Sequence, residues 1–265
     1  GEETLHELME GRGGFEHNRQ GLRVVDLLEH KYHDFRGLNL TYETREGIVK
    51  HESPYDLPDL SGSLQFMPEK SATLETQVVN LSDQIAYTSH DLDDGLKAGY
   101  LSLNQLKGVG LWQEIYEGMD LGIEEENRKT KAVRSLIATQ ITDAIETTGR
   151  RLEELGIDSV AKVRGACALA SFSTEMALKD KELKSFLWSN LYCHYKVVKM
   201  ADKAKRYVKA LFETYVNDSR QLPPDFQKMV DRDTAERVVS DYIAGMTDRF
   251  AQDEYTRLFM PYARM

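Results

Sequence analysis

The chain has 265 residues, of which 41% are hydrophobic, so it can bury a full core as one large domain or two smaller ones. Its net charge of −10 argues against a protein that coats nucleic acid with its whole surface. No apolar run approaches the roughly 18 residues of a membrane span, so we expect no membrane partner. Two cysteines, Cys167 and Cys193, are too few for a disulfide scaffold and indicate a reducing cytoplasm. Both lie in apolar helical patterns and are expected to be buried.

Helical periodicity dominates the chain, and alternating strand patterns are almost absent. The sequence therefore predicts an all-α protein of ten or so helices. A glycine cluster at residues 11–14 is expected to be a connection, and residues 53–68, with three prolines, a long surface excursion. The expected helices cover residues 1–10, 15–32, 38–51, 71–95, 111–119, 124–148, 160–170, 175–200, 203–216, 224–228, 234–245 and 248–259.

The apolar spacing also predicts which side chains face the core. In the helix at 15–32 these are Leu22, Val25 and Leu28, and in the helix at 38–51 they are Ile48 and Val49. The helix at 124–148 has a strongly apolar face, formed by Val133, Leu136, Ile137, Ile141 and Ile145.

The helix at 71–95 carries the most informative pattern. Its apolar positions have helical spacing and comprise Leu74, Val78, Leu81, Ile85 and Leu92. Gly95 is expected to end it, because glycine takes the left-handed C-cap conformation without strain. Asp83, Tyr87 and Asp91 follow each other at intervals of four residues, with His90 beside them, and so share one stripe of the helix. Spacing alone leaves two alternatives open, a solvated polar face and a site.

One segment stands out by its charge. Residues 179–209 contain nine Lys or Arg against three Asp or Glu, which leaves −16 for the rest of a chain whose net charge is −10. Such a segment could meet phosphates or an acidic partner, or be the solvated side of an amphipathic helix.

Nine short motifs occur in a fixed order along the whole chain. They are Gly1–Glu3, Phe15–Gln20 (FEHNRQ), Leu38–Thr41, Gly47–His51, Pro68–Lys70, Leu74–Gln77, Asp83–Tyr87 (DQIAY), His90–Gly95 and Asp241–Phe250 (DYIAGMTDRF). Together they resemble the deoxyguanosine triphosphate triphosphohydrolase family of HD-domain phosphohydrolases. This resemblance implies an HD-domain-like multi-helix bundle with additional C-terminal helices. Residues 1–110 would be the remainder of the HD catalytic core, and residues 111–265 a helical part packed on it.

The resemblance implies hydrolysis of a deoxynucleoside triphosphate to deoxynucleoside and inorganic triphosphate, assisted by Mn²⁺, Mg²⁺ or Fe²⁺. The family holds its metal with a His, a His-Asp pair and a later Asp, and only Asp83 matches this set. The other three ligands, and a catalytic histidine, precede the position that Gly1 and Glu2 match, so we expect them to lie upstream of the given sequence.

The remaining site residues are also implied by the resemblance. Glu2 and His17 match positions close to the α-phosphate, Tyr87 the ring that packs against the deoxyribose, and Asp91 the acceptor of its 3′-hydroxyl. A ring packed at C2′ leaves no room for a hydroxyl, which would favour deoxynucleotides. Two further substrate-binding candidates are Lys50, for the β- and γ-phosphates, and Arg128.

Arg134 is a weaker candidate of the same kind, whereas His90 and Arg249 receive no role. The alternatives are an HD-domain 5′-nucleotidase or general phosphohydrolase, and a non-catalytic module that binds nucleotides or single-stranded nucleic acid through residues 179–209. The resemblance further implies a homo-oligomer and leaves room for a nucleotide effector and for single-stranded DNA as partners.

Overall fold

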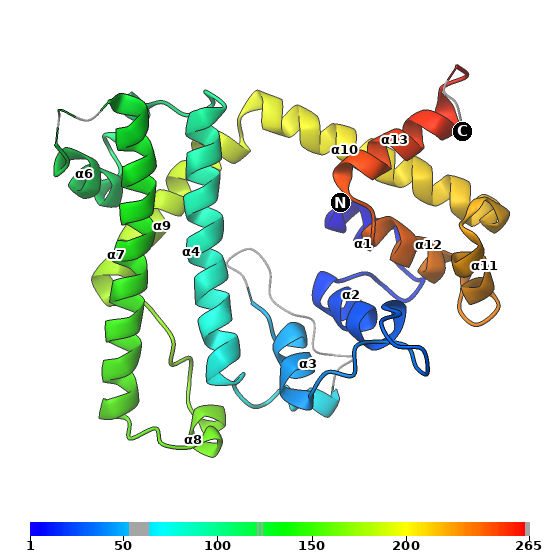
Figure 1. The fold of residues 1–265 in the computed structure, drawn as a ribbon, viewed down its shortest axis with the longest axis horizontal. Coiled ribbons are helices and arrows are strands. Elements are labelled where there is room, and N and C mark those ends of the chain that lie inside the picture. Colours follow the sequence, from blue (N-terminus) through cyan, green and yellow to red (C-terminus); the bar gives the residue numbers. More distant parts are fainter. Residues whose placement is uncertain (53–63, 121, 123, 263–265) are drawn as a thin grey trace. The chain divides into compact units, whose positions relative to one another are not determined.

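The computed structural model describes residues 1–52, 64–120, 122 and 124–262, and contains helices but no strand among them (Figure 1). The all-α prediction is therefore confirmed. By its internal contacts the chain divides into unit 1, Gly1–Leu40 with Lys199–Met265, and unit 2, Thr41–Val198. The expected division into residues 1–110 and 111–265 differs from these two units, and it stays a prediction. No helix in the described part is long and apolar enough to cross a membrane.

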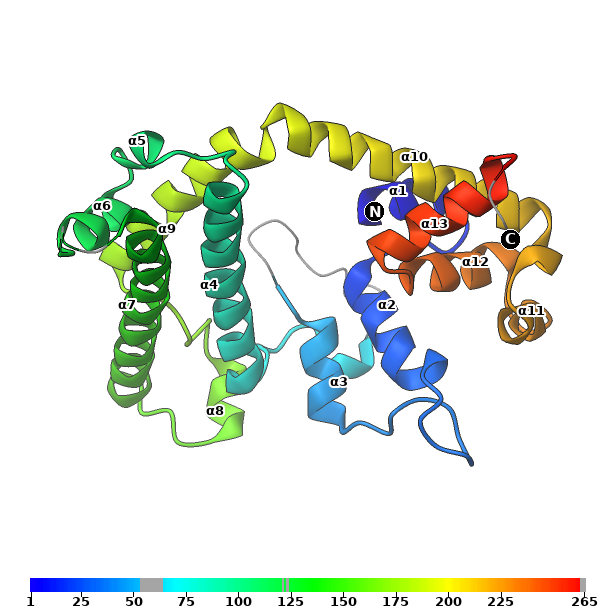
Figure 2. The ribbon, with the colours of Figure 1, turned by 45° about the horizontal axis from the view of Figure 1, so that its top comes forward.

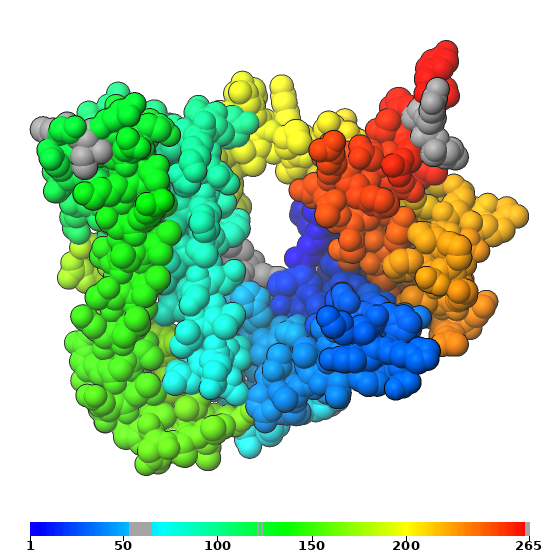
Figure 3. All heavy atoms as spheres, in the orientation of Figure 1, coloured from blue at the N-terminus to red at the C-terminus, as the bar shows by residue number. Residues whose placement is uncertain are grey.

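Unit 2 is built around two long helices, α4 and α7, which pack against each other and lie side by side in Figures 1 and 2. In the space-filling view the atoms of the two helices meet along most of their length (Figure 3). Helix α6 packs against both α7 and α9, and α9 also packs against α4. The helices of this unit are α3 (Tyr42–Val49), α4 (Leu74–Lys97), α5 (Leu103–Leu106), α6 (Gly110–Glu117), α7 (Glu125–Glu154), α8 (Val160–Gly165) and α9 (Thr174–Leu187), with a 3₁₀ turn at Leu64–Phe66 and a π-helical turn at Trp188–Tyr192.

The core of unit 2 fills the space between these helices. Its most enclosed side chains are at most 2% exposed and include Leu92, Leu106, Trp112, Leu136 and Leu183. They come from α4, α5, α6, α7 and α9, so each of these helices contributes to one shared core. Because core burial is the main stabilising term, this packing fixes how α4 is turned about its own axis.

Unit 1 combines both ends of the described chain. Its core contains Met9, Phe212, Tyr215, Val238 and Val239, all at most 1% exposed. The elements are α1 (Glu2–Leu8), α2 (His17–Arg23), a π-helical turn at Val24–Leu28, α10 (Tyr195–Asn217, in this unit from Lys199), a 3₁₀ turn at Ser219–Gln221, α11 (Pro224–Val230), α12 (Ala235–Ala244) and α13 (Asp248–Phe259). Residues from the start of the chain therefore share a core with residues more than 200 positions later.

The expectation that Gly95 ends the long helix is wrong. Helix α4 continues to Lys97, and Gly95 is a buried residue inside it. A Cβ atom at Gly95 would lie 2.6 Å from Cδ1 of Leu101, so the glycine is needed for close packing. The left-handed residue is Gly99, with φ +68°, and the N–H of Tyr100 bonds the carbonyl of Gly95 at 2.9 Å, as in a Schellman motif.

Several apolar side chains that were expected in the core are exposed. On α4 Val78 is 45% exposed, and on α7 Ile141 and Ile145 are 43% and 67% exposed. The buried positions of α7 include Gln140 and Ala144. Ile141 and Ile145 each follow one of them, and one residue turns the side chain by about 100° around a helix. Periodicity found the helix, but the buried face is set by the neighbouring helices.

Both cysteines are exposed rather than buried, which corrects the expectation from their apolar surroundings. Cys167 lies beyond the end of α8, because that helix stops at Gly165 and not at residue 170. Cys193 follows the π-helical turn, where the helix expected over 175–200 is interrupted before α10 begins at Tyr195.

Helix α2 and its π-helical turn end at Leu28, four residues earlier than expected. The following loop returns to it, and the N–H of Leu38 bonds the carbonyl of Val25 at 2.7 Å. The side chains of Leu22, Val25 and Leu28 are only partly buried, whereas Asn18 and Gln20 are buried.

Helix α3 starts at Tyr42, after the N-cap residue Thr41, instead of at residue 38. Val49 is buried as expected and Ile48 is partly buried. Of the prolines in the expected surface excursion, Pro54 and Pro58 lie outside the described residues.

Candidate functional site

The stripe of Asp83, Tyr87 and Asp91 lies on the side of α4 that faces away from the unit 2 core. The side chain of Asp83 is 56% exposed and Tyr87 is 47% exposed, whereas Asp91 is partly buried. On the other side of the helix, Ile85 and Leu92 are buried. The structure thus brings the three predicted residues together on successive turns, each turn rising about 5.4 Å.

Tyr192 completes this surface and was not found from the sequence. Its hydroxyl donates a short hydrogen bond to Oδ2 of Asp91, and its ring centroid lies 6.2 Å from that of Tyr87. Trp188, from the same π-helical turn, meets the Tyr192 ring edge-on at 6.1 Å. Burial, and then hydrogen bonds with Asp91 and Tyr87, raise the pKa of Tyr192, so the phenol stays protonated and remains a donor.

Two aromatic rings and a carboxylate acceptor are therefore adjacent on unit 2. This combination suits a sugar, because an aromatic face can pack against the ring while a carboxylate accepts a hydroxyl proton. The only sequence signal for Tyr192 is that Trp188 and Tyr192 are four residues apart, which says nothing of a partner 101 residues away.

His51 is a second residue that sequence reasoning did not assign to the site. Its Nε2 lies 3.8 Å from Oδ2 of Asp83, and its Nδ1 lies 2.7 Å from Oδ1 of Asn80. An amide oxygen can only accept, so Nδ1 donates to Asn80, and Nε2 is the ring nitrogen that faces Asp83. Two atoms that bind one metal ion, each about 2.1 Å from it, can lie 3.8 Å apart, as Nε2 of His51 and Oδ2 of Asp83 do.

Glu2 and His17 form a hydrogen-bonded pair within unit 1. Oε1 of Glu2 accepts the backbone N–H of His17 at 2.8 Å and lies 2.9 Å from its Nδ1. Glu16 caps α2 by accepting from the N–H groups of Asn18 and Arg19, and its Oε1 is 3.4 Å from the same imidazole nitrogen. Among the described residues, Glu2, Glu16 and His17 are the one group of three side chains close enough to hold a metal ion. A carboxylate that orients an imidazole in this way suits acid–base chemistry.

Lys50 does not point into open solvent, because its side chain is buried at 4% exposure. Its ammonium donates to Oε1 of Glu46 at 3.0 Å and to the carbonyls of Met67 and Lys70, both at 2.8 Å. All three of its N–H groups thus have protein acceptors. A phosphate could reach this ammonium only by displacing one of them, so the structure gives no support to the predicted phosphate contact.

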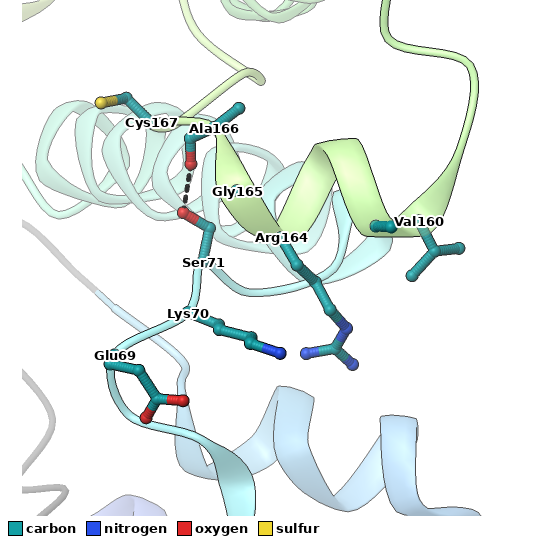
Figure 4. A pocket seen from close by; sticks show the side chains of 9 residues that line it. Glu69, Lys70, Ser71, Val160, Arg164, Gly165, Ala166 and Cys167 are labelled. Carbon is teal, nitrogen blue, oxygen red and sulfur yellow. Dashed lines mark hydrogen bonds between the residues drawn. The ribbon is translucent and has the colours of Figure 1, made fainter.

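Glu46, which is fully buried, also receives two hydrogen bonds from Arg164, at 2.7 and 2.6 Å. Figure 4 shows Arg164 from α8 beside Lys70, at a surface cavity of about 650 Å³. In the same view, Ser71 donates to the carbonyl of Ala166 and so joins the segment before α4 to the end of α8.

Arg128 lies at another place on unit 2. Its guanidinium is 3.9 Å above the ring of Tyr116 and donates to the Tyr116 carbonyl at 3.1 Å. It borders a cavity of about 680 Å³ that also includes Leu96 and Gly99, at the C-terminal end of α4, but not the stripe residues. Arg134 is exposed on α7. Arg128 is thus not brought to the stripe.

The basic charge of residues 179–209 is largely compensated by neighbouring carboxylates. The ion pairs are Lys179 with Glu114 and Glu175, Lys184 with Asp180, Lys205 with Glu3, Arg206 with Asp202, and Lys209 with Glu213. Exposed pairs of this kind add little stability, but they lower the potential that would attract a phosphate backbone.

Comparisons with known proteins bear on the whole chain. Residues 170–257 match the model of the phosphohydrolase-associated domain. The chain is 48% identical to a deoxyguanosinetriphosphate triphosphohydrolase-like protein of Geobacter sulfurreducens over 270 residues, which cover 100% of the chain and 70% of that protein. A protein of the same description from Geobacter metallireducens is 49% identical with the same coverage. One from Bordetella pertussis is 43% identical and covers 96% of the chain and 67% of its own length.

Proposed function

The chain belongs to the family of deoxyguanosinetriphosphate triphosphohydrolase-like proteins, and from this premise we propose that it hydrolyses deoxynucleoside triphosphates to deoxynucleosides and inorganic triphosphate. The observation that carries the proposal is the surface of unit 2 where Asp83, Tyr87 and Asp91 occupy successive turns of α4 and Tyr192 bonds Asp91. An exposed carboxylate, an aromatic face and an oriented acceptor follow each other there in the order of a phosphate, a sugar ring and a sugar hydroxyl.

Each side chain has a role that its surroundings allow. Tyr87, with its exposed ring, packs against the deoxyribose and excludes a 2′-hydroxyl. Asp91 accepts the 3′-hydroxyl, and Tyr192 orients the carboxylate from the other side. In unit 1, the carboxylate of Glu2 holds the imidazole of His17, and this pair is our candidate for proton transfer.

The donor atoms near Asp83 fit a divalent metal ion. Its carboxylate is exposed, and Nε2 of His51 lies 3.8 Å away. Carboxylate oxygen with imidazole nitrogen is a donor set that suits Mn²⁺ and Fe²⁺, and carboxylate oxygen suits Mg²⁺. A bound ion of this kind would polarise the α-phosphate and offset its charge. Asp83 and His51 are the residues of unit 2 that would hold it.

The proposal is tested by incubating the full-length protein with Mn²⁺ and dGTP and separating the products by anion exchange. Release of deoxyguanosine and intact triphosphate is the expected result. Pyrophosphate or monophosphate as the product would reject it and favour a general phosphohydrolase, and turnover of nucleoside monophosphates would favour a 5′-nucleotidase.

Substrate discrimination gives a sharper test with a matched control on the same helix. Tyr87→Ala should raise turnover of GTP relative to dGTP by at least tenfold, because the ring no longer excludes the 2′-hydroxyl. Val79→Ala, at a position of α4 that is 58% exposed, should leave the ratio unchanged. An unaltered ratio in Tyr87→Ala would remove the tyrosine from the sugar site.

A non-catalytic module that binds single-stranded nucleic acid is less well supported, since the ion pairs of residues 179–209 compensate much of their charge. Absence of single-stranded DNA binding at low salt would reject it. A nucleotide effector and a homo-oligomer stay predictions.

A further inference from the structure

A small pocket in unit 1 is surrounded by arginines. It has a volume of about 170 Å³ and is lined by Gly14, Glu16, Arg19, Gln20, Arg23 and Arg237. Half of the lining residues carry a guanidinium group. Pockets for organic ligands usually measure about 300–1,000 Å³, so this one suits a single small ion or group and is too small for a whole nucleotide.

Arg237 is the cation of this pocket that lacks a carboxylate partner. It is partly buried and donates to the carbonyls of Gly13, at 3.2 Å, and Gly14. It makes no ion pair with any residue in the described ranges. Burial lowers the pKa of Arg237, and the nearby charges of Arg23 and Arg19 act in the same direction, against Asp241 and Asp233.

Arg23 is held in place by two carboxylates. Its Nε bonds both carboxylate oxygens of Asp241, at 2.9 and 2.8 Å, and its Nη2 bonds Asp233 at 2.6 Å. Asp241 is 2% exposed and also accepts from Nε2 of Gln20 at 3.0 Å. These two carboxylates thus balance and position Arg23.

Glu16 is the one acidic residue that lines the pocket, and both of its oxygens already accept N–H groups of α2. Its carboxylate caps the helix, and it makes no ion pair with Arg237. Arg237 is partly buried without an ion pair in the described residues, and burying a cation costs free energy unless an opposite charge joins it. A small anion would supply that charge, and guanidinium groups bind the oxygens of tetrahedral oxyanions with directed N–H donors.

We propose that this pocket binds a small phosphate-type oxyanion, held by Arg19, Arg23 and Arg237. The ligand is either free inorganic phosphate or the phosphate group of a larger molecule whose remainder stays outside the pocket. The proposal rests on unit 1 alone and does not depend on the proposed function.

Binding should stabilise unit 1, because the arginines belong to separate elements. Arg19 lies on α2, Arg23 at its end and Arg237 on α12, so one anion would connect the two helices. A ligand that binds only the folded state stabilises it by RT ln(1 + [L]/Kd), so the unfolding temperature rises with the ligand concentration.

The test is calorimetric titration of the full protein with inorganic phosphate at constant ionic strength, together with thermal unfolding in phosphate and in chloride. Saturable binding and a higher unfolding temperature in phosphate are expected. Equal unfolding temperatures in both salts and no binding heat would overturn the proposal. Adenosine 5′-monophosphate distinguishes the two ligand sources: binding as tight as that of phosphate identifies an attached phosphate group, and weaker binding identifies the free ion, either of which supports the pocket.

Variants locate the binding. Arg237→Gln should weaken phosphate binding by about tenfold or more, because the substitution removes a charge-assisted donor. The glutamine amide can still donate to the Gly14 carbonyl. Arg19→Gln, at an exposed position, should weaken phosphate binding as well. Arg220→Gln is the matched control, because this exposed arginine of unit 1 pairs with Asp218 outside the pocket. Affinity in Arg19→Gln and Arg237→Gln equal to that of the control would overturn the assignment.

Discussion

Replacing Glu46 by glutamine removes the one carboxylate that Lys50 and Arg164 share inside unit 2. Glu46 is 0% exposed and Lys50 is 4% exposed, and the side chain of Arg164 is 12% exposed. Glutamine has nearly the same shape but no charge, so both cations would stay buried without a counter-charge. Removing one partner of a buried ion pair costs about 3–5 kcal/mol. For a unit of this size we expect the unfolding temperature to fall by about 10 °C.

The chain offers a selective probe for this unit. Its two tryptophans, Trp112 and Trp188, both lie in unit 2, and Trp112 is fully enclosed in the core. Tryptophan fluorescence during urea unfolding therefore reports unit 2. Glu43→Gln is the control, because Glu43 is an exposed acid on the same helix, and it should cost less than about 1 kcal/mol. Equal urea midpoints for the two variants would refute the role of Glu46 as the buried carboxylate that Lys50 and Arg164 share.

The pH dependence of this effect has a definite sign. Burial alone would raise the pKa of Glu46, but hydrogen bonds from Arg164 and Lys50 outweigh it and lower the pKa. A carboxyl group with a lowered pKa in the folded state contributes its full stability above its unfolded value of about 4.3 and loses it as the pH falls through the folded value. The wild type should thus exceed Glu46→Gln by a constant amount from pH 8 to about pH 5, and the difference should shrink at lower pH.

Three further changes test the packing of Gly95, the buried ion pairs of Glu46 and the candidate site. Gly95→Ala should destabilise unit 2 by about 1–3 kcal/mol, because the new Cβ atom would lie 2.6 Å from Leu101. Gly149→Ala on α7 is the control, because a Cβ atom there would have no atom within 4 Å. In the same urea assay it should be neutral or stabilising by up to about 1 kcal/mol. Lys50→Met should lower stability and leave the KM for dGTP unchanged if the ammonium is structural, and a raised KM with unchanged stability would restore its predicted phosphate role. Tyr192→Phe should raise the KM for dGTP several-fold from pH 6 to 9 alike, because its raised pKa keeps the phenol protonated throughout.

Local pattern was enough to predict most of the helices and the α4 stripe, because both depend on residues within a few turns of one another. Side-chain partners from distant segments were not predictable in this way. Tyr192 meets Asp91 across 101 residues, and His51 approaches Asp83 from a separate helix end. Nothing in the sequence around Lys50 shows that an aliphatic stem and an ammonium will be enclosed by other segments.

Tertiary packing also overrode the local signals of individual residues. Glycine after an apolar run usually ends a helix, but at Gly95 the missing side chain makes room for Leu101, and the helix ends at Lys97 instead. Cysteine in an apolar pattern is usually buried, yet Cys167 and Cys193 follow helix ends and are exposed. These residues were misjudged because the competing cause lies in another segment of the chain.

The orientation of the candidate site follows from the core behind it. Each residue turns a helix by about 100°, so Ile85 and Leu92, seven residues apart, point in nearly the same direction. Asp83 and Tyr87 are each two residues from Ile85, about 200° away, and must face outward when Ile85 is buried. Close contact of Leu101 with Gly95 holds the same rotation at the far end of the helix. Changes to these buried positions should therefore disturb the site by turning α4, even though none of them touches a substrate.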